Sequence, residues 1–278
     1  MLPTARIDAH QHYWQYEPTA YAWLDDSLRP LRRHFTPDEA WHEMRQAGFE
    51  RSIAVQVRQS LEETRWLLAL ADAHPFIAGV VGWVDLGSPA VVADLDAIAA
   101  HRKLIGVRHI VQAEPDGFLA SPGFRRGVAR LDRYGLTYDV LVYARQLPDA
   151  VDFVRALPEQ RFIVDHLAKP DIKGGGYAAW RQHFAALAEL PHVWCKLSGL
   201  VTEADWQSWT AEDLRPYVQT ALDCFGPERL MIGSDWPVCT VAGSYARTIQ
   251  AMEDALGGCT PAERASVLGG TAQRLWNL

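Results

Sequence analysis

Eight short apolar segments recur along the chain, and an amphipathic stretch separates each from the next. They are rich in Val, Ile, Leu and aromatic residues and nearly apolar throughout, which is typical of strands that are buried on both faces. We predict strands over residues 6–14, 52–57, 76–86, 104–112, 136–143, 161–168, 192–199 and 229–237.

Helical patterns fill the intervals between these strands. Thr36 with Pro37 begins one helix, and Ser60 followed by Glu63 begins another with the spacing of a capping box. We predict helices over residues 36–48, 60–74, 88–101, 121–135, 147–158, 177–190, 211–226 and 244–257, with one or two more in residues 260–278. Strands and helices that alternate eight times over about 250 residues predict an α/β fold, a (β/α)₈ TIM barrel. A doubly wound sheet is the alternative, but no GxGxxG follows the first strand.

Composition narrows the possible partners. The net charge of −7 argues against nucleic acids and anionic membranes, because both reward clustered Lys and Arg. No apolar run approaches the ~18 residues that span a bilayer, and the first residues lack a signal-peptide pattern. The four cysteines form no CxxC pair, which predicts free thiols and a cytoplasmic protein. The sequence indicates one domain over residues 1–278 and leaves the oligomeric state open.

Polar residues interrupt the predicted strands near their ends. His10 and His12 alternate, so they should project from the same face as Asp8. The active sites of (β/α)₈ barrels lie at the C-terminal ends of the strands. We therefore expect the polar residues of other strand ends to gather with the two histidines at one mouth: Arg108, His109, Asp165, His166, Lys196, Ser198 and Asp235.

Four of these residues suggest two kinds of chemistry. His10, His12, His166 and Asp235 suit a mononuclear site for Zn²⁺ or a similar ion, with room for a water. The same groups could act without metal, with Asp235 taking a proton from water while the imidazoles or Arg108 polarise a carbonyl. Both interpretations stay open at this point.

The remaining polar residues have structural alternatives. Because Arg108 and His109 alternate, we expect Arg108 to face the substrate and His109 to face outward. Asp165 is out of phase with His166 and is expected to be a supporting group. Lys196 is either a substrate contact or half of a structural pair, and Asp8 either holds a histidine tautomer or ends a turn.

Aromatic residues also fall at strand ends. Trp14, Trp236 and Tyr143 are candidates to cover the apolar face of a sugar ring. Most of the other aromatic residues are expected to pack in the core.

Several motifs together resemble a known family. IDAHQHYW, GVRHIVQ, VDHLAKP, KLSGL, MIGSDWPV and the tail TAQRLWNL look like the sugar-lactonase branch of the amidohydrolase superfamily (amidohydrolase family 2), which includes L-fuconolactonase-like and L-rhamnonolactonase-like enzymes. The resemblance covers nearly the whole chain. It implies a (β/α)₈ barrel that opens a small sugar-acid lactone with water. His10, His12, His166 and Asp235 match the family's strand-end histidines and aspartate.

The resemblance also bears on the metal. Binuclear members of the superfamily carry a bridging ligand on strand four and histidines on strands five and six. This chain instead has Arg108-His109 on strand four and Val142-Tyr143 at the end of strand five, which favours one divalent metal or none. Two rival functions remain: metal-dependent decarboxylation of an acid on the same scaffold, and sugar binding without catalysis.

Overall fold

The computed structural model describes residues 5–278. The first four residues, on which the expectation about a signal peptide partly rests, lie outside this range. The strands are β1 (Ile7–Gln11), β2 (Arg51–Val55), β3 (Ile77–Gly82), β4 (Leu104–His109), β5 (Thr137–Val140), β6 (Phe162–Val164), β7 (Val193–Leu197) and β8 (Leu230–Ile232). The α-helices are α1 (Pro37–Gln46), α2 (Leu61–Ala73), α3 (Val91–Ile98), α4 (Pro122–Val128), α5 (Leu147–Arg155), α6 (Tyr177–Ala188), α7 (Leu200–Glu203), α8 (Ala211–Phe225), α9 (Tyr245–Ala255), α10 (Pro261–Ala265) and α11 (Thr271–Trp276).

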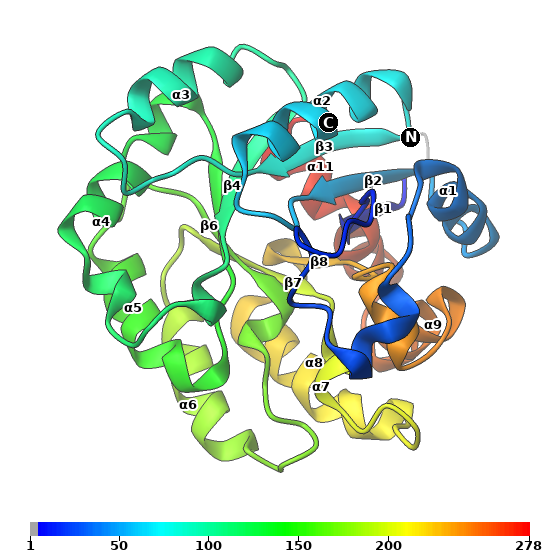
Figure 1. The fold of residues 1–278 in the computed structure, drawn as a ribbon. Helices are drawn as coiled ribbons and strands as arrows, with labels where there is room; N and C mark the ends of the chain where they lie inside the picture. The colour runs from blue at the N-terminus through cyan, green and yellow to red at the C-terminus, as the bar shows by residue number, and fades with distance from the viewer. Residues whose placement is uncertain (1–4) are drawn as a thin grey trace.

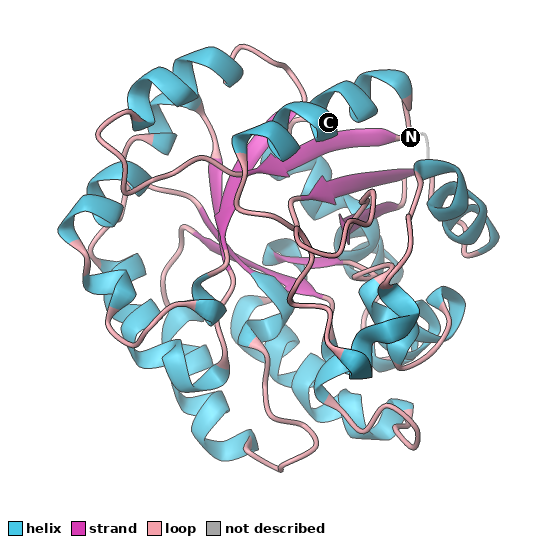
Figure 2. Ribbon diagram, viewed as in Figure 1, coloured by secondary structure: helices cyan, strands magenta, loops and turns pink. Residues whose placement is uncertain are grey.

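The eight strands form one parallel sheet whose order follows the sequence. The helices surround this sheet, which lies at the centre of the molecule (Figure 1 and Figure 2). The ring closes just beyond β8, where the amide of Asp235 donates to the carbonyl of His10 at 2.9 Å and the amide of His12 donates to the carbonyl of Trp236 at 2.7 Å. The predicted (β/α)₈ barrel is confirmed.

The strands are shorter than the apolar segments that predict them. The predicted strand 161–168 contains only Phe162–Val164 as strand, and the predicted strand 6–14 ends at Gln11. Apolar character persists past each strand end because the loops beyond it remain buried, so hydrophobicity alone marks the core and not the end of strand pairing. Pro122–Val128 and a 3₁₀ turn at Leu131–Tyr134 replace the single predicted helix 121–135.

The interior of the barrel is apolar near α11. Side chains from six strands form a separate hydrophobic cluster there with Ala272: Ile7, Ala9, Ile53, Val55, Val81, Ile105, Ile163 and Met231. Leu275 and Trp276 of α11 pack against this cluster. Charged and polar side chains therefore occupy the opposite part of the interior, toward the strand ends.

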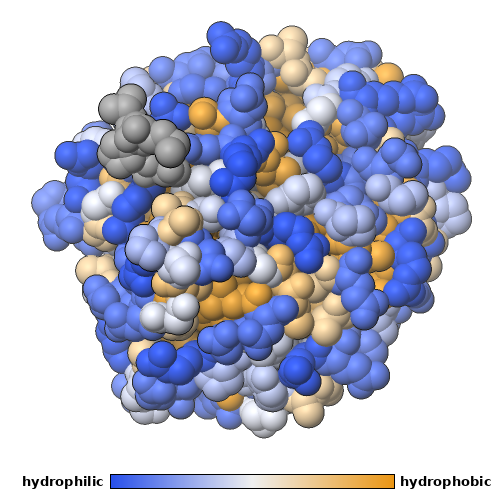
Figure 3. Space-filling view, turned by 180° about the vertical axis from the view of Figure 1, so that it is seen from behind, coloured by the Kyte–Doolittle hydropathy of each residue, from blue (hydrophilic) through white to orange (hydrophobic). Residues whose placement is uncertain are grey.

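The exterior is mostly hydrophilic when seen from behind, with hydrophobic residues gathered below the centre of the view (Figure 3). Among the described residues, the large exposed hydrophobic side chains are Trp23, Val92 and Tyr143. No helix in residues 5–278 combines the length and apolar character that a membrane crossing requires.

Candidate active site

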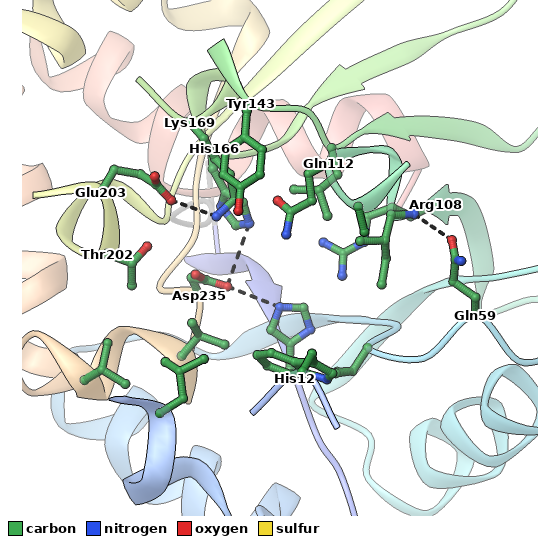
Figure 4. Close-up of a pocket in the computed structure, with 18 of the residues that line it drawn as sticks. His12, Gln59, Arg108, Gln112, Tyr143, His166, Lys169, Thr202, Glu203 and Asp235 are labelled. Atoms are coloured by element: carbon green, nitrogen blue, oxygen red, sulfur yellow. Dashed lines mark hydrogen bonds and ion pairs between the residues drawn. The ribbon is translucent and has the colours of Figure 1, made fainter. Parts of the chain in front are cut away.

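A cavity of about 540 Å³ opens where the strands end. His12 follows β1, Arg108 belongs to β4, Tyr143 follows β5, His166 follows β6, and Asp235 follows β8 (Figure 4). Segments from across the whole chain thus contribute to one concave surface, at the end of the barrel where the fold predicts an active site.

Three imidazoles converge on the Asp235 carboxylate. From its Oδ1 atom, the Nε2 atoms of His12, His10 and His166 lie at 3.2, 3.8 and 3.9 Å. The Nε2 atoms of His10 and His12 are 3.2 Å apart. The four residues expected from the sequence therefore meet at a single point, and each of them is at least nine-tenths buried.

The hydrogen bond of the outer ring nitrogen of His12 fits a cation at this point. Nδ1 of His12 lies 2.8 Å from the carbonyl oxygen of Val55, and a carbonyl can only accept, so Nδ1 carries the proton. In neutral His12, Nε2 is then a bare acceptor that faces the carboxylate oxygen of Asp235. A divalent ion or a shared proton would satisfy both acceptors. The Nδ1 atom of His166 lies 2.8 Å from Ser198 Oγ. The Nδ1 atom of His10 lies 3.3 Å from the Lys196 ammonium, which can only donate, and 3.4 Å from Asp165 Oδ1.

The pKa shifts of His10, His166 and Asp235 keep each of these three groups in one charge state near neutral pH. Burial lowers the pKa of His166 to about 4 and holds the pKa of His10 well below its ordinary value. Burial acts in the opposite direction on Asp235, but the imidazoles of His166, His12 and His10 outweigh it and hold its pKa below the usual range. An ionised Asp235 therefore faces neutral rings of His10 and His166.

His166 reaches the site from a left-handed turn. His166, Leu167, Ala168 and Lys169 have φ angles of 54, 51, 56 and 48°. Such a conformation costs an L-residue roughly 1–2 kcal/mol, so surrounding contacts must hold it. The indole of Trp180 donates to the carbonyl of Leu167 at 2.7 Å, and Leu167 and Ala168 are fully buried. The turn directs both of its polar side chains, His166 and Lys169, into the cavity.

A network of buried charged side chains lies beside the site and contacts its His10. Arg108 contacts Asp165 at 3.0 Å and the side chain and carbonyl of Gln56. Lys196 forms ion pairs with Asp139 and with Asp165, the second at 3.0 Å. Burial raises the pKa of Asp139 to about 7, even though the Lys196 ammonium opposes this rise. Burial also opposes ionisation of Asp165, but Lys196, His10 and Arg108 hold its pKa well below the usual range.

Lys196 and two of the aromatic candidates do not reach the cavity wall. Lys196 is fully buried inside the network. Trp14 is also fully buried, because its indole donates to the carbonyl of Arg33 and its ring packs 4.9 Å from that of Phe35. The ring of Trp236 packs 5.4 Å from that of Phe35, and Trp236 is 3% exposed. Tyr143 and Arg108 do line the cavity.

Asp8 and His109 also point away from the cavity. The pairing of β1 with β2 shifts register between Asp8 and Gln11, so Asp8 does not share the direction of the two histidines as simple alternation predicts. Its carboxylate instead accepts hydrogen bonds from the Tyr245 hydroxyl and the Ser234 amide, both at 2.9 Å. His109 turns outward as expected and stacks on Phe118.

Several residues of the cavity wall carry no periodic sequence pattern that predicts them. They are Trp23, Gln59, Gln112, Lys169, Thr202, Glu203 and Trp206. Lys169 lies in the VDHLAKP motif, three residues after His166, and this closeness to a site histidine is the sequence feature that indicates it. The others lie in loops or short helices beyond the strands, where no periodicity indicates which side chains face inward.

The barrel with its converging histidines and aspartate is typical of hydrolases that act at the mouth of such a fold. The chain belongs to the amidohydrolase family, whose family model matches residues 7–278.

Relatives with named activities cover almost the whole chain. L-fucono-1,5-lactonase of Burkholderia multivorans is 44% identical over 98% of this chain and 96% of its own length. L-fucono-1,5-lactonase of Burkholderia ambifaria is 37% identical over 99% and 96%. A crystal structure of an amidohydrolase from Burkholderia multivorans with bound zinc matches with a TM-score of 0.94 and 43% identity over 99% of both chains.

Proposed function

We propose that the protein is a carboxylic ester hydrolase that opens a sugar-acid lactone, such as L-fuconolactone, with water. The observation that carries the proposal is the convergence of His10, His12 and His166 on the Asp235 carboxylate within one cavity. The two L-fucono-1,5-lactonases of similar length support the substrate class. Their names do not favour decarboxylation or non-catalytic sugar binding, the rival functions considered for the sequence.

In the proposed reaction, Asp235 removes a proton from water while His10 and His12 hold its carboxylate in place. The water oxygen bonds to the lactone carbonyl carbon, and negative charge develops on the carbonyl oxygen. His166 and Arg108 stabilise this charge. The bond between the carbonyl carbon and the ring oxygen then breaks, and the ring oxygen takes up the proton that Asp235 removed from water. The new carboxylic acid releases its own proton to solvent and leaves as a carboxylate.

Of the four residues that the sequence suggests as metal ligands, the described structure groups His10, His166 and Asp235, whose ligand atoms lie within 4.8 Å of one another. These three would hold one divalent metal ion such as Zn²⁺, and His12 lies outside this group. When bound, such an ion supplies Lewis acidity that lowers the pKa of water and polarises a carbonyl. A sugar lactone has a better leaving group than an amide, so the protein groups alone can supply part of the catalysis.

A panel of aldonolactones tests the proposal, because each turnover releases one proton that a pH indicator detects. The panel is run with and without added Zn²⁺ and after chelation. We expect at least one neutral sugar lactone to be hydrolysed with kcat/KM of roughly 10⁴ M⁻¹ s⁻¹ or more. Failure of every lactone in all three conditions would contradict the proposed function.

The acid limb of the pH profile provides a second prediction. Because burial lowers the pKa of His166 to about 4, its ring should stay neutral well below the ordinary histidine range. We expect kcat/KM to be flat between roughly pH 5.5 and 8 and to fall only as the pH approaches 4 and His166 takes up a proton. Initial rates, corrected for spontaneous hydrolysis, give the profile. A midpoint near 6.5 would show that the imidazole is not held neutral.

We also propose that the chain acts as one catalytic domain on a small molecule. The continuous sheet of the described residues and the family match over residues 7–278 support this. The four cysteines are free in the structure, as predicted, and a cytoplasmic location stays a prediction from them.

A further inference from the structure

Lys169 and Glu203 form an ion pair on the cavity wall. Lys169 is the last residue of the left-handed turn, and Glu203 ends α7. Their Nζ and Oε1 atoms are 2.7 Å apart, and their side chains are 14% and 17% exposed. Nζ also lies 5.6 Å from the centre of the Tyr143 ring. The pair therefore faces the cavity beside His166 and Tyr143, opposite the His12 side of the site (Figure 4).

The charges along the described cavity wall cancel. Two cations, Arg108 and Lys169, and two carboxylates, Glu203 and Asp235, line it. Arg108 directs its guanidinium N–H groups at protein acceptors, Asp165 and Gln56. Lys169 is matched by Glu203. Both cations of the described cavity wall are therefore paired with protein acceptors. Neither offers an unpaired positive charge to a carboxylate on the sugar.

The Lys169–Glu203 pair still has hydrogen-bonding capacity to spare. An ammonium has three donors, and a carboxylate has about four acceptor sites. The contact between the two groups uses one donor and one acceptor, so the remaining sites can bind other groups that reach the cavity. A hydroxyl both donates and accepts, and it can therefore bond to both partners at once.

We infer that the Lys169–Glu203 pair determines substrate specificity by binding the hydroxyls of an uncharged sugar lactone and by disfavouring lactones that carry a carboxylate. The inference rests on the proposed function and concerns the substituents of the sugar, not the reacting carbonyl. Glu203 has two effects in this arrangement: it accepts from a hydroxyl, and it cancels the charge that would otherwise attract an anionic substrate.

Removal of the Glu203 charge should change the preference in a defined direction. Glu203→Gln keeps the shape of the side chain but leaves Lys169 unmatched. The two probes are galactonolactone and galactarolactone, which differ in carrying a hydroxymethyl group or a carboxylate at the last carbon. We expect kcat/KM to fall about 10-fold for the neutral lactone and to rise about 10-fold for the carboxylated one, since hydrogen bonds between charged groups are the stronger ones.

Two further variants separate charge from shape. In the double variant Lys169→Met with Glu203→Gln, the cation is gone, so the carboxylated lactone should gain nothing over the unaltered protein. Asp205→Asn removes the carboxylate of a neighbouring exposed ion pair. Its Oδ2 atom lies 3.0 Å from Nζ of Lys173, whose side chain is 68% exposed. Asp205 does not line the cavity, and its variant should keep the original preference.

The outcomes distinguish the inference from the function on which it rests. Turnover by the unaltered protein with the same preference in Glu203→Gln would overturn the inference alone, provided that thermal melting shows the variant to be folded. A gain on the carboxylated lactone in the double variant would also overturn it, because that gain could not come from Lys169. Absence of turnover with any lactone in the unaltered protein would overturn both.

Discussion

Asp235→Asn is expected to lose about 10²-fold or more in kcat while the protein stays folded. The substitution preserves the size of the side chain but removes the ionised oxygen on which His10, His12 and His166 converge. A general base contributes roughly 10²–10⁴-fold to a rate, and an amide cannot act as one at neutral pH. Initial rates on the best lactone of the panel measure the loss, and thermal melting checks the fold.

A matched control keeps this result specific. Asp152 on α5 is 75% exposed and lies outside the cavity, so Asp152→Asn should leave kcat unchanged. Retention of more than about a tenth of the activity in Asp235→Asn would contradict the assignment of Asp235 as the base. If the protein binds sugars without catalysis, the unaltered protein and the Asp235→Asn variant should bind the sugar equally, and neither should hydrolyse a lactone.

Lys196→Met is expected to produce the largest loss of stability. The substitution removes the ammonium that lies between Asp139 and Asp165 and leaves two fully buried carboxyl groups with too few partners. Loss of one member of a buried ion pair typically costs about 3–5 kcal/mol of the free energy of unfolding. For a chain of this size, the melting temperature should fall by roughly 10 °C.

A double-mutant cycle tests the cause of this loss. Asp139→Asn removes one of the two carboxylates, so the pair of substitutions should recover part of the stability that Lys196→Met loses. Lys173→Met provides the surface comparison, because Lys173 belongs to an exposed pair and should change stability by less than about 0.5 kcal/mol. A change below about 1 kcal/mol in Lys196→Met would show that the network tolerates an unmatched charge.

The sequence predicted the barrel and the four converging residues, for identifiable reasons. Buried parallel strands are apolar along their length, so the sequence pattern indicates how many strands there are and in which order they follow. His10, His12, His166 and Asp235 follow such strands, and the geometry of a barrel brings strand ends together. The motifs that carry the family resemblance contain these same residues.

Other features of the site depend on contacts that the sequence does not show. Trp14 stands at a strand end, but Phe35 and the carbonyl of Arg33 draw it into the core. Asp8 alternates with His10, but a register shift in the pairing with β2 removes the shared direction. Lys196 meets Asp139 because β5 and β7 lie on either side of β6 and direct the two side chains toward each other.

The left-handed turn explains why the sequence does not predict that Lys169 faces the cavity. Four consecutive residues with positive φ and no glycine among them are not predicted by any propensity, because each conformation is unfavourable on its own. Only the finished surroundings, including the Trp180 indole, stabilise the turn. Glu203, the partner of Lys169, arises from a short helix whose position depends on the loop after β7.

The hydrogen bonds that close the ring join His10 and His12 to Asp235 and Trp236, so the last strand to emerge from the ribosome delivers the reactive carboxylate. A nascent polypeptide that stops before Leu230 contains the three histidines but neither β8 nor the carboxylate that follows it. Any product of synthesis that stops before Asp235 lacks this carboxylate and should show no turnover.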